Sequence, residues 1–291
     1  MRRLLGANER ENLANSLHEL AFAKDRTGDI ESAEALYRED LQIRRSLSGG
    51  DTLRIAGTLT RLGLLLREKG DLDGAEASAR EALAIATRLR GANHPSVISG
   101  LTNLGLVLLD RGDFTGAEPM LRDALERARR TMGDRDDFVP MYIHNVGLAL
   151  AGQKRFAEAD SLLSRVVAIE RDFGATSELG FTLGSLGRLK FQRGRPAEAE
   201  TLLREALEIF ENTLPPEHWR IAETHGSLGE SLAAQGKFAE AEPLITRSHS
   251  VLLSLRGPDH RRTREAQARL DRLYEQWRGR VTSSDDTEYR L

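Results

Sequence analysis

A short motif returns along the chain at an almost constant interval, and this recurrence limits the possible folds more strongly than any other feature. The motif begins with a turn, most often Gly-Asp, and continues with an alanine and an acidic residue. Successive alanines are separated by 42, 42, 42, 40 and 42 residues. They stand at Ala33, Ala75, Ala117, Ala159, Ala199 and Ala241. Such self-similarity is typical of repeat proteins, in which each unit stacks on its neighbours.

A second small residue lies twelve positions before each of these alanines. This column contains Ala21, Gly63, Gly105, Gly147, Gly187 and Gly229. A glycine inside a helix costs about 1 kcal/mol relative to alanine, so its recurrence predicts two helices that approach closely at this point. An apolar residue directly precedes each small residue, from Leu20 to Leu228, and another stands three positions earlier in the first five repeats. This spacing predicts a buried helical stripe; the sixth repeat departs from it with His225.

These columns predict an all-α fold in which each repeat is a pair of helices of about 16 and about 18 residues. One pair cannot bury its apolar stripe, so neighbouring pairs must stack into a continuous core. We expect six repeats over residues 9–258, with a remnant of a preceding repeat or an N-terminal cap at residues 1–8. Residues 259–278 repeat the first-helix pattern with Asp271 in the glycine position, which predicts a polar capping helix. A disordered tail is expected at residues 279–291.

The leucine–glycine pair, the alanine twelve residues later and the paired helices resemble the tetratricopeptide repeat over nearly the whole chain. The 42-residue period, the segment Ala117-Glu118-Pro119-Met120-Leu121 and the loop His94-Pro95 are similar to the long variant of this repeat in kinesin light chains. The resemblance implies a solenoid wound as a right-handed superhelix, whose first helices line a concave groove. It also implies a non-catalytic scaffold or adaptor that binds a peptide or a partner protein there, without naming the partner.

The resemblance also implies which side chains face this groove. They are Thr60, Leu64, Arg67, Thr102, Asn103, Leu106, Leu109, His144, Asn145, Leu148, Phe181, Arg188, Phe191 and Gln192. The lysine–asparagine clamp of family members that bind chaperone tails is not matched, because Thr60, Thr102 and His144 stand where its lysine would be. Recognition of chaperone C-termini is therefore not expected.

Two groups among these residues suggest how a peptide would be held. Leu64, Leu106 and Leu148 occupy equivalent positions in three repeats and form either the groove floor or core between helices. We favour the floor, because the core columns are already assigned to other residues. Asparagine side chains such as Asn103 and Asn145 can hydrogen-bond the backbone of an extended peptide, while apolar pockets provide selectivity.

The C-terminal part has a narrower likeness. The segments 216–223 and 270–277 resemble the tails that follow bacterial eukaryotic-type Ser/Thr kinase domains. Arginine greatly outnumbers lysine, a bias that GC-rich bacterial genomes show. The alternative function is therefore a regulatory or sensory tail of a larger bacterial signalling protein.

No group of residues supports catalysis or metal binding. Asp172-Phe173-Gly174 has the letters of a kinase magnesium motif, but it ends a predicted helix and lacks the other kinase elements. His94, His218 and His260 recur at equivalent loop positions, where whole repeats separate them, so we interpret them as loop or capping residues. The basic clusters at 127–130 and 261–264 are flanked by acids and are interpreted as solvated surface.

Composition excludes several further classes of protein. The chain has no cysteine, which rules out disulfides and thiolate metal sites. Its formal net charge of -3 gives no basic field for nucleic acid, and no apolar run is long enough to insert into a membrane. We expect no cofactor and no metal, and the sequence specifies no oligomeric state. We expect a cytoplasmic location, or an extracytoplasmic one if the chain is a fragment of a membrane-anchored kinase.

Overall fold

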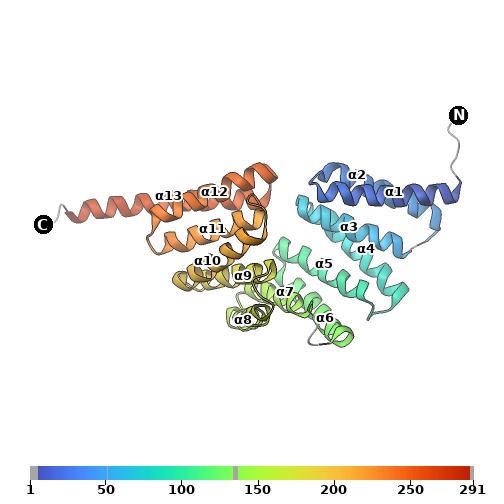
Figure 1. Cartoon of the computed structure of the whole chain (residues 1–291), viewed down its shortest axis with the longest axis horizontal. Helices are drawn as coiled ribbons and strands as arrows, with labels where there is room; N and C mark the ends of the chain where they lie inside the picture. The colour runs from blue at the N-terminus through green and yellow to red at the C-terminus, as the bar shows by residue number, and fades with distance from the viewer. Residues whose placement is uncertain (1–5, 51, 134–136, 289–291) are drawn as a thin grey trace. The chain divides into compact units, whose positions relative to one another are not determined.

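Thirteen helices and no strand make up the part of the chain that the computed structural model describes, residues 6–50, 52–133 and 137–288, with 280–288 as backbone only (Figure 1). The first helices of the six repeats are α1 (Ala7–Arg26), α3 (Leu53–Lys69), α5 (Pro95–Arg111), α7 (Val139–Gly152), α9 (Ser177–Gln192) and α11 (Trp219–Ala234). The second helices are α2 (Ile30–Ser48), α4 (Leu72–Arg90), α6 (Phe114–Met132), α8 (Phe156–Asp172), α10 (Pro196–Thr213) and α12 (Phe238–Arg256). The last helix is α13 (Arg261–Glu288).

The chain divides into two compact units, Met1–Gln153 and Lys154–Leu291, which we call unit 1 and unit 2. Unit 1 contains α1 to α7 and unit 2 contains α8 to α13. Within unit 1, α3 contacts α5 and α5 contacts α7, and within unit 2, α11 contacts both α9 and α13. No two second helices make comparable contact among the described residues. First helices therefore form the inner layer of each unit, and we call the exposed face of this layer its inner surface.

The two small-residue columns explain how the helices of one repeat pair. All six anchor alanines are 0% exposed. A Cβ atom added to Gly105 would lie 2.6 Å from the Leu121 side chain, and one added to Gly187 would lie 2.8 Å from that of Leu203. Because a methyl group here would force the leucine side chain to move, the glycines fit the close approach of the first helix to the second. The packing reason predicted from their recurrence is confirmed.

The Gly-Asp turn caps the second helix in the first three repeats. The side chains of Asp29, Asp71 and Asp113 accept hydrogen bonds from the backbone N–H three residues later. The preceding glycines, such as Gly70 at φ +94°, adopt the left-handed conformation that ends the first helix. Together the two residues close one helix and open the next, which explains why the motif recurs.

A column of acidic residues joins each repeat to the one that follows. The residue after each anchor alanine contacts a side chain at the end of the next first helix or, in the last repeat, on α13. These pairs are Glu34–Lys69 (2.7 Å), Glu76–Arg111, Glu118–Gln153 (2.7 Å), Asp160–Arg193, Glu200–Gln235 (2.8 Å) and Glu242–Tyr274 (2.7 Å). We call this set the acid column.

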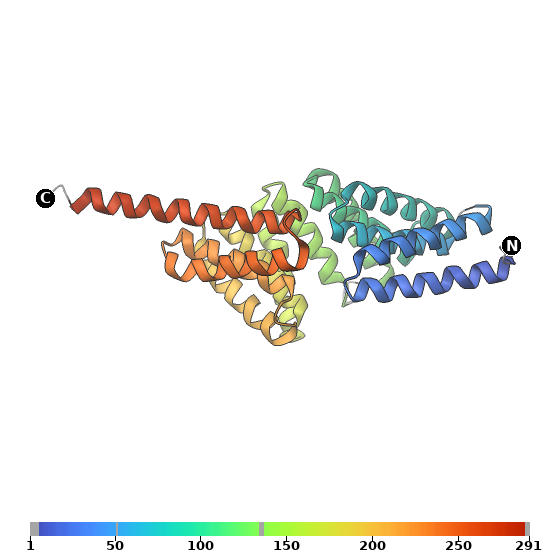
Figure 2. The same ribbon diagram turned by 90° about the horizontal axis from the view of Figure 1, so that it is seen from above.

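Three expectations concern the ends of the array. Leu20, expected in a buried stripe, is 48% exposed, because its equivalents pack towards the preceding repeat and no described helix precedes α1. Disorder was expected from residue 279, but no proline interrupts the segment and α13 continues to Glu288, past the end of α12 (Figure 2). Residues 1–5, most of the expected remnant of a preceding repeat, lie outside the described residues.

Candidate functional site

The inner surface of unit 1 carries ten of the fourteen predicted groove residues. Seven of them are half-buried and so remain accessible: Thr60, Leu64, Arg67, Asn103, Leu106, Leu109 and Leu148. The half-buried leucines at 64, 106 and 148 come from α3, α5 and α7, one from each successive first helix. Partial exposure fits a groove floor better than a core column, whose members in these helices are almost completely covered.

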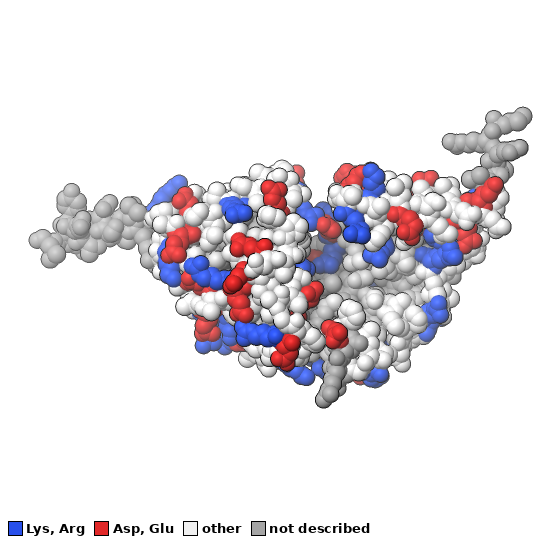
Figure 3. All heavy atoms as spheres, in the orientation of Figure 1, with Lys and Arg blue, Asp and Glu red and all other residues white. Residues whose placement is uncertain are grey.

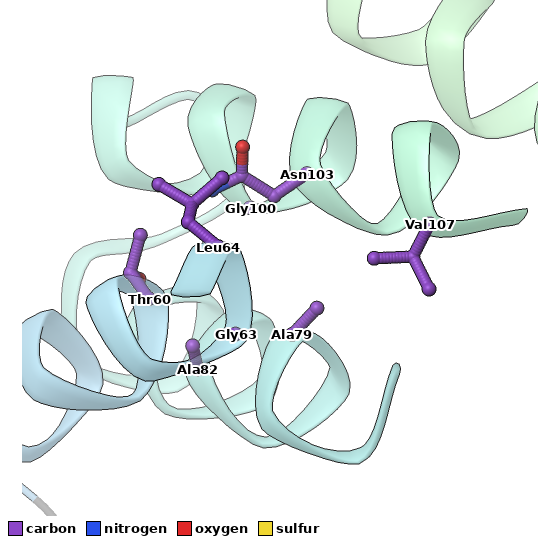
Figure 4. A pocket seen from close by; sticks show the side chains of 8 residues that line it. All are labelled: Thr60, Gly63, Leu64, Ala79, Ala82, Gly100, Asn103 and Val107. Carbon is purple, nitrogen blue, oxygen red and sulfur yellow. The ribbon is translucent and has the colours of Figure 1, made fainter. Parts of the chain in front are cut away.

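Thr60, Leu64 and Asn103 lie together where α3, α4 and α5 meet (Figure 4). The close-up shows the Asn103 amide beside the Leu64 side chain, with Thr60 next to it and Val107 farther along α5. The crevice that these residues line has a volume of about 10 Å³. A space of this size holds at most one water molecule, so the crevice is part of a surface and is too small to be a ligand cavity.

Three predicted residues are not available for direct contact. Thr102 is buried, and its hydroxyl donates to the backbone oxygen of Ile98 at 2.9 Å. His144 and Asn145 are only 2% and 6% exposed. Side chains between first helices are covered because those helices contact one another directly, as α5 and α7 do. The prediction of these three residues as peptide contacts is therefore wrong for the conformation described.

Arg67 is half-buried and belongs to a contact between neighbouring repeats. Its Nε atom donates to a carboxylate oxygen of Asp110 at 2.6 Å, joining α3 to α5. This pairing neutralises the guanidinium, so Arg67 contributes shape to the surface more than free charge.

The inner surface of unit 2 carries the other four predicted residues. Phe181, Arg188 and Phe191 are half-buried and Gln192 is exposed, all on α9. Arg220 of α11 lies with its guanidinium carbon 4.9 Å from the centre of the Phe181 ring and 5.4 Å from that of the Trp219 ring. Sequence reasoning missed Arg220 and Trp219, because they stand in the first turn of α11, outside the groove positions that the resemblance implies.

A larger hollow lies farther along the inner surface of unit 2. Its volume is about 260 Å³, enough for one amino-acid side chain. Phe191, Ala233, Ala234, Ile245 and Leu273 supply apolar lining, and Glu230, Arg269, Arg272 and Gln276 supply polar lining. Figure 3 shows acidic and basic side chains alternating over α10 to α12, whereas the surface over α4 and α5 of unit 1 is largely uncharged.

One buried group in unit 1 has the residue types of a catalytic triad without its geometry. The carboxylate of Asp40, 0% exposed, accepts a hydrogen bond from the Thr58 hydroxyl at 2.7 Å and lies 3.1 Å from His18 Nδ1. The hydroxyl thus donates to the carboxylate and not to the imidazole, so no base activates it. Arg44 Nε lies 2.6 Å from the other carboxylate oxygen, which makes the group a buried ion pair linking α1, α2 and α3.

The capping role predicted for the three loop histidines is confirmed, and Asp172 stands at a helix end as expected. Nδ1 of His94, His218 and His260 accepts the backbone N–H two residues later, each at 3.2 Å, which caps a first helix or α13. Asp172 ends α8, followed by exposed Phe173. Within the described ranges no three His, Cys, Asp or Glu side chains are grouped to hold a metal ion. No helix in the described part of the chain is long and apolar enough to cross a membrane.

Sequence profiles of the tetratricopeptide repeat match residues 13–52, 54–130, 139–212 and 185–248. One of them alone covers 54–130 and 139–212, more than half of the chain. The chain belongs to the tetratricopeptide repeat family. No curated protein matches this tetratricopeptide repeat protein by sequence.

Solved structures with the same fold are distant in sequence. Repeats of a putative kinesin light chain from Podospora anserina superpose with a TM-score of 0.53 at 20% identity, covering 70% of this chain and 98% of that one. BtubC (BKLC) from P. vanneervenii gives 0.59 at 20% identity, covering 78% and 92%. A Rap protein complexed with competence and sporulation factor gives 0.62 at 14% identity, covering 90% and 75%. The expected solenoid of kinesin-light-chain-like repeats is confirmed, and at these identities the likeness concerns the fold.

Proposed function

We propose that this tetratricopeptide repeat protein is a non-catalytic scaffold that binds a peptide or a segment of a partner protein on the inner surface of unit 1. The observation that carries the proposal is the row formed by Leu64, Leu106 and Leu148. Three leucines at equivalent positions stay half-buried on successive first helices, with Asn103 among them. Partly exposed apolar side chains in a contiguous row, with a hydrogen-bonding amide beside them, suit an extended peptide.

Family membership supports the proposal at a general level. Tetratricopeptide repeats are generally protein-interaction modules without catalytic activity. A second structural relative, the Rap conjugation gene regulator of plasmid pLS20, was solved in complex with the Phr* peptide, and superposes with a TM-score of 0.59 at 17% identity over 90% of this chain and 73% of that one. Such relatives make a peptide ligand a reasonable expectation here. The alternative of a regulatory tail in a larger signalling protein stays a prediction.

Leu106→Glu tests the proposal directly, because it places a charge in the middle of the row. The matched control is Leu89→Glu, the same exchange at a leucine that is 44% exposed and belongs to α4, a second helix. Wild type and both variants are used to capture proteins from lysate of the source organism. Circular dichroism first establishes that the three proteins are equally helical.

We expect wild type and Leu89→Glu to capture the same protein and Leu106→Glu to lose it. Equal capture by all three proteins would place binding on another surface and refute the proposed site. A protein retained by Leu106→Glu but lost with Leu89→Glu would move the site to the second helices.

A further inference from the structure

In unit 2, three ion pairs join α11 to the last helix, α13, whereas none joins α11 to α9 among the described residues. Between α11 and α13, Glu223 lies 3.0 Å from Arg262, and Glu230 lies 2.8 Å from Arg269 and 2.6 Å from Arg272. Between α9 and α11, no ion pair occurs among the described residues. Since both interfaces are built from the same repeat, the difference lies in the residues that occupy equivalent positions.

Moving back by one 42-residue repeat identifies the exchanged residues. The equivalences are Phe181 for Glu223, Arg188 for Glu230, Arg220 for Arg262 and Ser227 for Arg269. On α9 the two acidic positions are therefore occupied by Phe181 and Arg188, while Arg220 is retained on α11. At these four positions the α9–α11 interface has two guanidinium groups and no carboxylate, whereas the α11–α13 interface has two guanidinium groups and two carboxylates.

Arg220 is packed as a cation without a carboxylate. Its guanidinium lies over the rings of Phe181 and Trp219, and its Nε atom is buried with no hydrogen-bond partner. Aromatic faces stabilise the positive charge, but they do not satisfy its N–H donors. Arg262 covers the Trp219 ring at 3.8 Å and is itself paired with Glu223.

Arg188 is in a similar state. Its only described side-chain hydrogen bond goes from Nη2 to the Ser185 hydroxyl at 3.1 Å. Burial lowers the pKa of Arg188, and the nearby cations Arg262 and Arg269 add to this effect. Burial also lowers the pKa of Arg220. Nearby carboxylates oppose these shifts, Glu223 and Glu265 at Arg188 and Glu178 and Glu223 at Arg220, but Glu223 and Glu265 are already paired with arginines of α13.

A partly desolvated cation without an ion-pair partner is costly to the fold, and it persists most readily where a ligand supplies the missing charge. We propose that Arg188 and Arg220 form a site on the inner surface of unit 2 that binds the carboxylate groups of an acidic segment in a partner protein. At Arg220 a ligand carboxylate takes the part that Glu223 plays for Arg262 one repeat later, and Arg188 adds a second cation on α9. This inference rests on the proposed function in one respect, since it assumes that the ligand belongs to a protein.

Trp219 provides a reporter at the site. The chain has two tryptophans, so Trp277→Phe leaves Trp219 as the only one, while the stacked contact of residue 277 with Phe238 keeps an aromatic ring. The probe is N-acetyl-tetraglutamate amide, titrated into the purified full chain at low ionic strength while Trp219 fluorescence is followed. Inorganic phosphate is titrated in parallel. We expect a saturable change with the peptide and a weaker or absent change with phosphate.

Two variants test whether the uncompensated charge of Arg220 binds the peptide. Arg220→Gln removes the cation and should weaken peptide affinity about tenfold or more, because a charge-assisted hydrogen bond is lost. Phe181→Glu recreates the Glu223–Arg262 arrangement one repeat earlier, so it should weaken peptide binding and raise the melting temperature. Arg204→Gln, which alters an exposed arginine on α10, is the matched control and should bind as wild type does.

The proposal is overturned if tetraglutamate leaves the fluorescence unchanged, if phosphate or a single-stranded oligonucleotide binds as tightly as the peptide, or if Arg220→Gln binds like Arg204→Gln. Should Phe181→Glu fail to fold, Arg220→Gln still decides the matter. A failure here is distinct from a failure of the proposed function, because Leu106-dependent capture on unit 1 requires neither arginine.

Discussion

Units 1 and 2 are built from the same repeat but treat their polar groups differently. In unit 1, Asp29, Asp71 and Asp113 cap the second helices, and buried Asp40 is matched by Arg44. In unit 2, Arg155, Arg195 and Lys237 occupy the cap positions without a side-chain cap hydrogen bond. The glycine and alanine columns are almost the same in both units.

Packing columns and polar positions therefore have separate roles in this repeat. Small residues at fixed positions determine how helices pair, and a change there would affect any repeat alike. Polar positions vary from one repeat to the next, and they give each inner surface its own chemistry. Unit 1 therefore offers an apolar row of leucines, while unit 2 offers charged and aromatic side chains.

The largest effect is expected from the matched charge in unit 1. Asp40→Ala leaves Arg44 buried without its carboxylate and removes the acceptor of Thr58, so the free energy of unfolding should fall by about 3–5 kcal/mol. Urea denaturation followed by circular dichroism measures it. Glu39→Ala, an exposed neighbour on the same helix, should change little. Equal losses in the two variants would show that the buried pair does not stabilise unit 1.

His225 gives unit 2 a dependence on pH that an apolar residue would remove. Burial lowers its pKa from 6.5 to about 4, with a further contribution from Arg247. The unfolded chain therefore binds a proton more readily than the folded chain between these values. The contribution of neutral His225 to the free energy of unfolding is fully present above pH 6.5 and is lost as the pH drops towards 4, with a loss of about 2 kcal/mol at about pH 5.

His225→Leu restores the leucine that other repeats have in this column. Its free energy of unfolding should exceed that of wild type at about pH 5. It should also change less than that of wild type between about pH 7 and about pH 5, because no buried imidazole is left to bind a proton. Thermal unfolding across this pH range is the measurement. Parallel curves for the variant and wild type would exclude His225 as the source of the dependence.

A smaller effect is expected from the acid column. Lys237 holds the pKa of Glu200 at about 2 through a hydrogen bond, with Arg204 and Gln235 adding to it, so the ionised contact stabilises unit 2 above about pH 4.5 and is lost as the pH falls towards 2. Glu200→Ala should lower the free energy of unfolding by about 1–2 kcal/mol at neutral pH. The control is Glu208→Ala, at an exposed residue of the same helix. An equal loss of unfolding free energy in this variant would show that the acid column does not stabilise unit 2.

The smallest effects come from the helix caps and have opposite signs in the two units. Asp71→Ala in unit 1 removes a cap and should destabilise by about 1 kcal/mol. Arg195→Asp in unit 2 introduces one and should stabilise by about 0.5–1 kcal/mol. Denaturant titration of both variants compares them with wild type. Two changes of the same sign would mean that unit 2 does not share the cap geometry of unit 1.

The sequence alone was sufficient for the pairing of helices, because a residue such as Gly105 has no reason to recur unless another helix approaches it. It also led to the correct role for His94, whose position before Pro95 fits a cap. Exposure was harder to predict. Thr102 and Thr60 are equivalent in the repeat, yet one is buried and the other half-buried, and this depends on how closely neighbouring first helices pack.

The arginine site of unit 2 was missed for a different reason. Arg220 was outside the positions that the resemblance implied, and the departure of Phe181 from Glu223 becomes visible only when residues 42 positions apart are compared. The acid column had a signal in the motif itself, the acidic residue after each alanine. Its partner at the end of the next first helix varies among Lys, Arg and Gln, which conceals the pairing in the sequence.

The acid column also bears on how such a chain can grow or shrink. Every internal repeat carries an acceptor near the start of its second helix and a donor at the end of its first, so any copy can join any other. A duplication of 42 residues would arrive with both junctions already complementary, and a deletion of the same length would bring two compatible ends together. Arrays of different lengths are thereby open to evolution through single genetic events, with the inner surface of each new copy free to diverge.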